Sequence, residues 1–354
     1  MGGTGDAPAS VPAAIHREID AGGPMTFARF MELALYGPGG FYQTPPIGPR
    51  GDFVTSPHVH PVFGELLTRG VRELWDRLGR PRPFRITEVG AGDGMFARSL
   101  LSHTGEIPVR YTAVERSEGA RGALATIDGI EVREELTGPT DLVVANELLD
   151  NLPFRILRGD REVRIGHEED RFVEILAAPD DLAGFARADE ERVIPFGAFA
   201  FVDELADVLT PGYALVIDYG ALGSSGGPVH GYRGHTLVED VLADPGTADI
   251  TSGVDFELVA AHARSRGLTA FPTVTQRDAL TALGLGEWLQ DELRLQQKQL
   301  DAGDGREAVA TWSGRSQGSL LVDPGALGRL RWLLLASEGL GSPAWLGRAR
   351  TDGD

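Results

Sequence analysis

The chain has 354 residues, a formal net charge of −19 at pH 7 and no cysteine. A chain of this length can bury a large core and exceeds one ordinary domain. The acidic balance argues against nucleic acid as a partner, and the lack of Cys excludes disulfides and thiolate zinc sites. No stretch approaches the roughly 18 apolar residues of a membrane span. We therefore expect a cytoplasmic protein with no membrane, metal or nucleic-acid site.

The N-terminal part is expected to be helical. Residues 1–24 indicate a loose tail with a short helix, without the basic start and apolar run of a signal peptide. Residues 25–80 predict a helical lobe. In it Thr26 can cap a helix that Gly37 ends, and a second helix with one apolar face follows a Pro/Gly-rich loop over 38–57.

From residue 81 onward, short apolar strands alternate with helices, which predicts βαβ units and a doubly wound parallel α/β sheet. The expected strands are Phe84–Val89, Arg110–Glu115, Ile130–Arg133, Asp141–Ala145 and Ala214–Ile217. Two insertions interrupt the pattern, a charged β-rich segment at about 155–200 and a Gly-rich loop at 220–253. Towards the C-terminus we expect helices and two strands, Ser319–Val322 and Arg331–Leu335.

A glycine-rich loop directly follows the first expected strand and opens a helix. Glycines there let the backbone turn tightly and let a ligand approach closely. The loop supplies five candidate cofactor-binding residues: Glu88, Gly90, Ala91, Gly92 and Gly94. Glu115 ends the next strand, where a carboxylate can accept both hydroxyls of a ribose. This arrangement predicts a nucleoside-containing cofactor.

Two cofactors are compatible with this loop. The window Gly92–Ala97 fits a loose nicotinamide-dinucleotide fingerprint, but Met95 stands where the register beginning at Gly90 requires glycine. Glu88 is also a poor neighbour for a pyrophosphate. An acid beside the loop better suits the sulfonium and ammonium groups of S-adenosylmethionine, which we expect as the cofactor. A nicotinamide-dependent oxidoreductase is the weaker reading.

A third group of polar residues, Asn146, Glu147 and Asp150, follows the most apolar strand. Ligands of open α/β sheets lie at the carboxyl ends of the strands, and one helical turn can bring Glu147 and Asp150 to one side. The competing interpretation is an N-cap followed by first-turn acids that favour the helix dipole.

Several blocks resemble the MidA-type methyltransferases, a family that includes a mitochondrial complex I assembly-factor arginine methyltransferase. They occur in one order along the chain: Pro24–Met31, Gly40–Tyr42, Gly51–Pro57, Val62–Leu66, Glu88–Gly94, Asn146–Pro153, Ile217–Gly220, Tyr232–His235 and Asp249–Phe256. The sequence departs from the family's Gly-Pro-Gly-Arg-Gly loop at Ala91 and Asp93. An added negative charge there should tolerate a cationic cofactor, but it puts the acceptor in doubt.

The resemblance implies a class I methyltransferase-like doubly wound sheet over 81–354, capped by the N-terminal lobe and the insertions. It implies an S-adenosylmethionine-dependent enzyme that methylates an arginine guanidinium, in a protein or a small molecule. Glu147 and Asp150 are then the catalytic candidates, and Arg116 and Asn146 join the cofactor site. The blocks point to further residues that line the substrate site: Asp52, Phe53, Ser56, Asp218 and His235.

The sequence leaves the acceptor and the oligomeric state open, and a homodimer is one option. A cofactor-binding assembly factor with little catalysis is the alternative function, although the intact Asn146–Asp150 block favours an enzyme.

Overall fold

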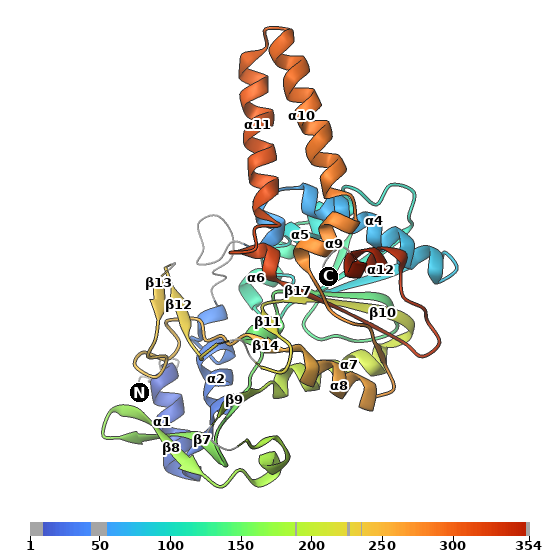
Figure 1. Ribbon diagram of the computed structural model, residues 1–354. Helices are drawn as coiled ribbons and strands as arrows, with labels where there is room; N and C mark the ends of the chain where they lie inside the picture. The colour runs from blue at the N-terminus through green and yellow to red at the C-terminus, as the bar shows by residue number, and fades with distance from the viewer. Residues whose placement is uncertain (1–9, 44–54, 188–189, 225–226, 235, 352–354) are drawn as a thin grey trace, which may run out of the picture.

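The computed structural model describes residues 10–43, 55–187, 190–224, 227–234 and 236–351 (Figure 1). Asp52, Phe53 and His235, which we expected near the substrate, lie outside these residues. In the described part, no helix combines the length and the apolar character that crossing a membrane requires.

The central sheet has the strand order β15-β17-β10-β5-β2-β3-β4, with β16 also pairing with β17. Its strands are β2 (Phe84–Val89), β3 (Val109–Val114), β4 (Ile130–Arg133), β5 (Thr140–Asn146), β10 (Leu209–Asp218), β15 (Thr269–Ala270), β16 (Val274–Thr275) and β17 (Arg331–Ala336). The strands from β10 to β4 are parallel, whereas β17 runs antiparallel to β10. The doubly wound α/β sheet predicted from the sequence is confirmed.

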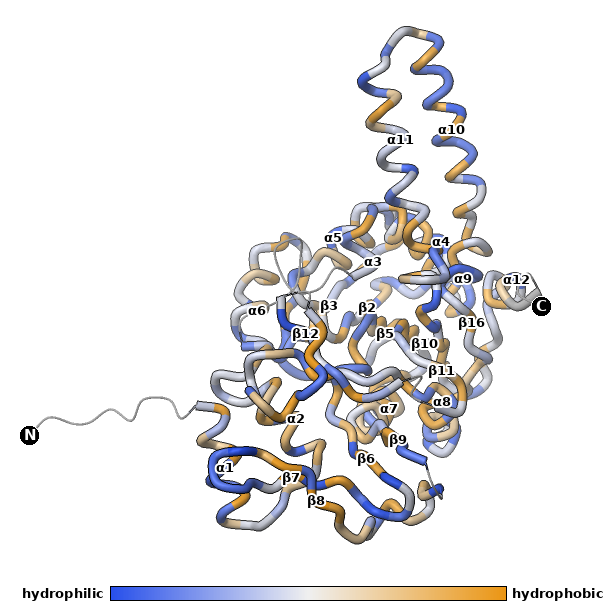
Figure 2. Tube along the Cα trace, turned by 60° about the vertical axis from the view of Figure 1, so that its left-hand side comes forward, coloured by the Kyte–Doolittle hydropathy of each residue, from blue (hydrophilic) through white to orange (hydrophobic). Residues whose placement is uncertain are grey.

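Helices cover both faces of this sheet. One face packs against α4 (Val62–Arg77), α5 (Met95–Leu101), α9 (Gln276–Ala282) and α12 (Ala344–Thr351). The other packs against α7 (Phe196–Val208) and α8 (Phe256–Ser265), and α6 (Glu118–Leu124) lies at the β3–β4 end. Along β5, Leu142 and Val144 enter the first core and Val143 and Ala145 the second. A strand buried on both faces explains the continuous apolar run in the sequence, and Figure 2 shows hydrophobic residues along the central strands.

A second, smaller sheet with two helices lies beside the main one (Figure 1). Its strands and helices are β1 (Met25–Thr26), β6 (Arg155–Arg158), β7 (Arg161–Glu168), β8 (Arg171–Ala177), β9 (Glu191–Ile194), α1 (Val11–Gly22) and α2 (Phe27–Tyr36). Thr26 caps α2 as expected, accepting a hydrogen bond from the N–H of Arg29. The helices expected in one lobe over 25–80 lie in two places, because α2 packs on this small sheet and α4 on the main sheet.

Short elements complete the connections. They are the 3-10 helices η1 (Phe41–Gln43), η2 (Leu149–Asn151), η3 (Asp180–Phe185) and η4 (Leu327–Arg329), the helix α3 (Ser56–Val59), and the strands β11 (Gly220–Ala221), β12 (Gly231–Arg233), β13 (Thr236–Val238) and β14 (Val254–Asp255). Three of these strands, β11 to β13, lie in the segment 220–253, which we expected to be a loop.

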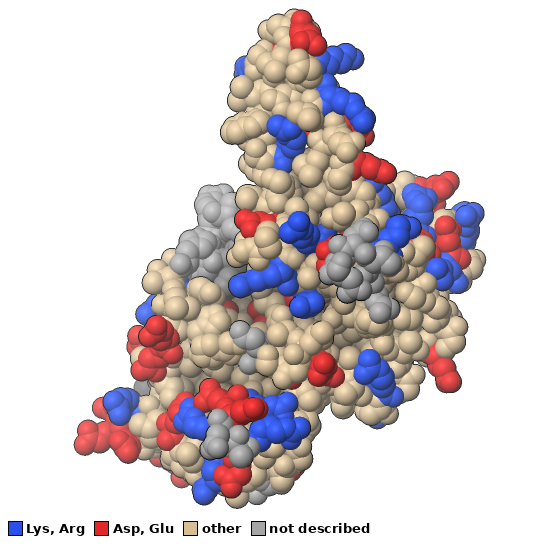
Figure 3. Space-filling view, viewed as in Figure 1, with Lys and Arg blue, Asp and Glu red and all other residues tan. Residues whose placement is uncertain are grey.

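A helical hairpin of α10 (Leu285–Asp301) and α11 (Gly305–Leu320) projects from the main body (Figures 1 and 3). The strand expected at Ser319–Val322 is wrong, because the chain there is the last turn of α11 and the residues that follow it. The β-branched and leucine-rich end of this segment favoured a strand locally, but no strand of the sheet pairs with it in the described structure.

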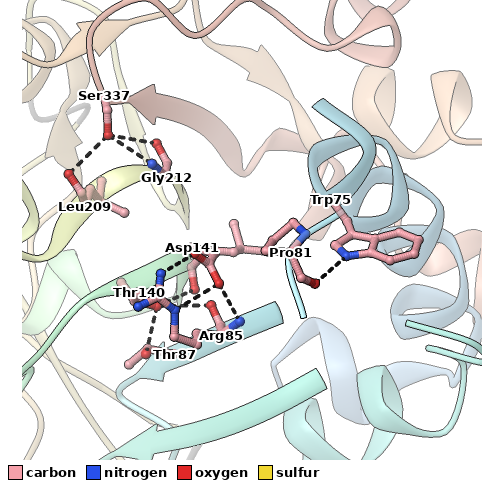
Figure 4. Close-up of polar contacts among 10 residues, drawn as sticks. Trp75, Pro81, Arg85, Thr87, Thr140, Asp141, Leu209, Gly212 and Ser337 are labelled. Atoms are coloured by element: carbon pink, nitrogen blue, oxygen red, sulfur yellow. Dashed lines mark hydrogen bonds and ion pairs between the residues drawn. The ribbon is translucent and has the colours of Figure 1, made fainter. Parts of the chain in front are cut away.

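The starts of the central strands are tied together by polar contacts (Figure 4). Asp141 at the beginning of β5 accepts hydrogen bonds from the backbone N–H of Arg85 at 2.7 Å and from its guanidinium at 2.5 and 3.0 Å. Near the other side of the sheet, the Ser337 hydroxyl donates to the carbonyl of Leu209 and accepts from the N–H of Gly212. These contacts lie at one edge of the sheet. The polar candidate residues lie at the opposite edge, at the carboxyl ends of the strands.

We predict that Leu334→Ala in β17 lowers the free energy of unfolding by about 2–5 kcal/mol, because it leaves a cavity in the core. Leu334, on β17, is fully buried in the core that the sheet forms with α4, α5, α9 and α12. Leu320→Ala, at a half-exposed position on α11, serves as the control and should change that free energy by less than about 0.5 kcal/mol. Urea denaturation measures both, and equal effects would contradict this placement of the core.

Candidate active site

The polar residues gather at the switch point of the sheet. From β2 the chain continues to β3 and β4 on one side, and it later returns to β5 and β10 on the other. The loop after β2 and the turn after β5 therefore leave two neighbouring strands in opposite directions. Open α/β sheets bind ligands in the crevice that forms between two such connections. Gly90 directly follows β2, and Asn146 is the last residue of β5.

The glycine loop has the left-handed backbone that its sequence predicts. Gly90 has a φ of 75° and Gly94 a φ of 77°, a region that residues with a Cβ seldom adopt. A Cβ at Gly90 would lie 2.9 Å from Cδ1 of Leu148, and one at Gly94 would lie 2.4 Å from Cδ1 of Ile127. Substitution at either position would therefore crowd the crevice or the packing behind it.

Glu115, the residue directly after β3, shapes this loop. Its carboxylate accepts hydrogen bonds from the N–H of Gly92 and the N–H of Ser117, both at 2.9 Å. The loop is also tied to β3 by the N–H groups of Gly90 and Ala91, which donate to the Val114 carbonyl. Each carboxylate oxygen has a second lone pair that could accept a ribose hydroxyl. The expected contact of Glu115 with a ribose stays a prediction.

Glu88 lies beneath the loop and is buried. The hydroxyl of Tyr111 donates to its Oε2 at 2.7 Å. Burial raises the pKa of Glu88 to about 8, because a carboxylate is costly to remove from water. An additional positive charge in the crevice would favour its ionised form.

The turn after β5 is held from below by Asp218, at the end of β10. Its Oδ2 accepts from the N–H groups of Leu148, Leu149 and Asp150 at 3.0, 2.6 and 3.4 Å. Its Oδ1 accepts from the N–H of Tyr219 at 2.7 Å. Asp218 is fully buried, and burial raises its pKa to about 7. The described contacts make it a cap that positions the turn, and its expected place in the lining of the substrate site stays a prediction.

Glu147 begins this turn in a strained conformation. Its φ of 54° lies in the left-handed region, which non-glycine residues adopt mainly where surrounding contacts enforce it. Its N–H donates to the Ile217 carbonyl at 2.7 Å. The carboxylate Oε1 accepts from the N–H of Ser56 and the amide of Asn146, both at 3.1 Å. Burial raises the pKa of Glu147 to about 7.

Asp150 and Asn146 retain unused acceptors. Oδ1 of each is buried and has no hydrogen-bond partner within the described residues. The other oxygen of Asp150 accepts from the Thr251 hydroxyl at 3.0 Å. Burial and then the carboxylates of Asp218 and Asp249 raise the pKa of Asp150. Buried acceptors without donors are costly, so this crevice suits a ligand that carries N–H groups.

Asp249 completes the acidic cluster, and we did not single it out from the sequence. It is buried, and it accepts from the Tyr42 hydroxyl at 2.9 Å and from the Asn151 amide at 2.9 and 3.1 Å. Burial raises its pKa to about 6. Its place at the head of the block Asp249–Phe256 was the available signal.

The remaining candidates lie at the edges of the site. Ser56 is buried and reaches Glu147 through its N–H. The Arg116 guanidinium stacks 4.4 Å from the centre of the Tyr36 ring and donates to Glu32 of α2 at 2.6 Å, so its expected cofactor contact stays a prediction. Within the described residues no group of three or more His, Asp or Glu side chains is arranged to hold a metal ion.

Comparison with known proteins decides the class of the reaction. A family model described as "putative S-adenosyl-L-methionine-dependent methyltransferase" matches residues 66–274, more than half of the chain. The chain belongs to this family. A protein of Burkholderia thailandensis solved with bound S-adenosyl-homocysteine is 25% identical, with a TM-score of 0.81 over 96% of this chain and 94% of that one.

Two curated relatives are the mitochondrial protein arginine methyltransferases NDUFAF7 of Xenopus laevis and Mus musculus. The frog protein is 29% identical over 294 residues, which are 68% of this chain and 67% of the relative. The mouse protein is 29% identical over 324 residues, which are 76% of this chain and 72% of the relative.

The methyltransferase uses S-adenosylmethionine as its cofactor, and the residues of the switch point fit this molecule. Gly90, Gly92 and Gly94 all have a positive φ, and backbone without Cβ atoms lets a ligand approach closely. Glu88 and Glu115 place carboxyl groups beneath and beside the loop, and acids there suit a ligand with sulfonium and ammonium charges. The expectation of S-adenosylmethionine rather than a nicotinamide cofactor is confirmed.

We predict that Glu88→Gln changes how folding stability of the cofactor-free protein depends on pH. Glu88 has a pKa of about 8 when folded and an ordinary value of 4.5 otherwise. Between these values the folded state holds a proton that the unfolded chain has released, so this carboxyl makes stability fall as the pH rises. The variant stays neutral, so wild-type stability should fall relative to it by up to about 1.4 kcal/mol per pH unit.

Urea denaturation from pH 5 to 8 measures this difference. Glu131→Gln is the control, because Arg133 and Arg110 lower the pKa of this half-buried glutamate, which is ionised throughout the range. Its difference from wild type should be independent of pH. Parallel pH profiles for wild type and Glu88→Gln would show that Glu88 is ionised in the folded protein.

Proposed function

We propose that this methyltransferase transfers the methyl group of S-adenosylmethionine to a guanidinium nitrogen of an arginine in a protein. The observation that carries the proposal is the pair of buried acceptors without donors, Oδ1 of Asn146 and Oδ1 of Asp150, beside the carboxylate of Glu147. A planar guanidinium presents several N–H donors in a fixed fork. The two relatives named as protein arginine methyltransferases support the same acceptor.

Charge supports this choice over a neutral acceptor. Glu147, Asp150, Asp218 and Asp249 converge on the turn after β5, and the pKa of each is raised. A cation bound nearby lowers the raised pKa of such carboxyl groups, because the opposite charge favours the ionised form. The site therefore gains most from a positively charged partner.

The residues of the turn would divide the work. S-adenosylmethionine supplies an electrophilic methyl carbon on a positively charged sulfur. Glu147 and Asp150 orient the guanidinium through charge-assisted hydrogen bonds. As the new N–C bond forms and the C–S bond breaks, the nitrogen loses a proton, and Glu147, with a pKa of about 7, is suited to accept it. Asp218 keeps both acids in place by capping their turn.

Glu147→Gln and Asp150→Asn are expected to lower kcat/KM for an arginine peptide by about 100-fold or more, since a positioned acid–base group contributes roughly 10²–10⁴-fold. The measurement is transfer of label from S-[methyl-³H]adenosylmethionine to the peptide and to a matched peptide with lysine in place of arginine. Asp203→Asn is the control. Asp203 lies on α7 and pairs with His262 on α8, away from the site.

Label on the lysine peptide alone would contradict the guanidinium acceptor. Wild-type activity in both Glu147→Gln and Asp150→Asn would contradict the assignment of the turn. Cofactor binding without transfer to any arginine peptide would favour the assembly-factor alternative. A cytoplasmic location, expected from the Cys-free composition, and a homodimer both stay predictions.

A further inference from the structure

A short turn connects the two halves of the site. It consists of Thr55 and the helix α3, and it lies between the glycine loop and the turn after β5. Nε2 of His58 is 2.9 Å from Oδ2 of Asp93 in the glycine loop. Two residues earlier, the N–H of Ser56 donates to Oε1 of Glu147 at 3.1 Å. One turn thus contacts both the cofactor loop and the carboxylate proposed to bind the acceptor.

The contact with the glycine loop is well anchored. The His58 side chain is only 3% exposed, and its Nδ1 lies 2.9 Å from the Thr55 hydroxyl. Asp93 uses its second oxygen to accept from the N–H of Met95, the first residue of α5, at 3.0 Å. Burial acts to raise the pKa of Asp93, but the hydrogen bonds from His58 and Met95 outweigh it, and its pKa is lowered. The pair therefore ties the turn to the start of a helix.

The contact with Glu147 comes from a residue, Ser56, that is itself held in place by buried neighbours. Ser56 is fully buried, and its hydroxyl lies 3.1 Å from Nε2 of Gln276. Gln276 is also fully buried and donates to the Leu321 carbonyl at 3.0 Å. Because Ser56 is anchored in this way, the turn holds His58, two residues later in the chain, at a fixed place relative to the Glu147 carboxylate.

We propose that His58 and Asp93 are positioning residues that hold the glycine loop in register with Glu147, so that the methyl donor and the acceptor nitrogen are aligned. Neither residue touches the reacting atoms; both act through the loop and through Ser56. Methyl transfer needs close in-line approach, and misplacement by about 1 Å can cost roughly 100-fold in rate. The acceptor half of this proposal rests on the proposed function, whereas the cofactor half does not.

Binding of S-adenosyl-homocysteine, measured by calorimetry, tests the cofactor half without any acceptor. His58→Leu keeps the buried volume but removes both hydrogen bonds, and Asp93→Asn keeps the acceptor for Met95 but removes the charge. We expect each variant to bind about tenfold more weakly, since a charge-assisted hydrogen bond is lost. The double variant should bind no more weakly than the weaker single one, because the two residues act as one link.

His262→Leu is the matched control. It breaks another His–Asp pair, with Nε2 of His262 2.8 Å from Oδ1 of Asp203, on the far layer of helices. It should bind S-adenosyl-homocysteine as wild type does. His58→Gln, which keeps a donor, should stay within about threefold of wild type. Unchanged affinity in Asp93→Asn, or single effects that multiply in the double variant, would overturn the proposal; Asp93→Asn decides alone if His58→Leu does not fold.

Turnover tests the link to Glu147. A purely structural role of His58 would lower kcat equally with and without the Glu147 carboxylate. At saturating S-adenosylmethionine and arginine peptide, His58→Leu should lower kcat about tenfold in the wild-type background but less than about twofold in the Glu147→Gln background. Equal losses in both backgrounds would overturn the link. If wild type methylates no arginine peptide, the proposed function fails, and the binding experiment still decides whether the pair holds the loop.

Discussion

The carboxylate of Asp218 accepts hydrogen bonds from the backbone N–H groups of three consecutive residues after β5, Leu148 to Asp150, and from that of Tyr219. These donors would otherwise be buried without partners, at a cost of about 1–3 kcal/mol each. This single cap lets the chain turn sharply at the switch point and holds Glu147 in its left-handed conformation. Every contact of Glu147 and Asp150 depends on that turn.

The site combines two demands that normally conflict. Its acids are gathered where water is scarce, which raises the pKa of Glu88, Glu147, Asp218 and Asp249, and this stores unfavourable free energy in the cofactor-free protein. A positively charged cofactor relieves part of it by favouring the ionised carboxylates. Stability has thus been given up at the switch point in exchange for affinity for cations, as functional sites often require.

Local patterns predicted the central elements well. The apolar run in β5, the cap at Thr26 and the glycines at Gly90 and Gly94 depend on chain neighbours alone, and the structure has each as expected. Helix α11 was missed and the strand at Ser319–Val322 was wrong. Most of α11 is exposed, so burial imposes little hydrophobic period on its sequence, and β-propensity in its last turn had no sheet edge to join.

The sequence by itself determined the alternation of strands and helices, the cofactor loop and the acids that end the strands, because period, backbone freedom and charge are written residue by residue. Only the tertiary structure decided which acids meet and what they do. Asp218 caps a turn about 70 residues earlier in the chain, Asp249 binds Asn151, and His58 reaches Asp93. Such pairs depend on the register of packed sheets and helices, and local sequence cannot specify contacts between segments that only packing brings together.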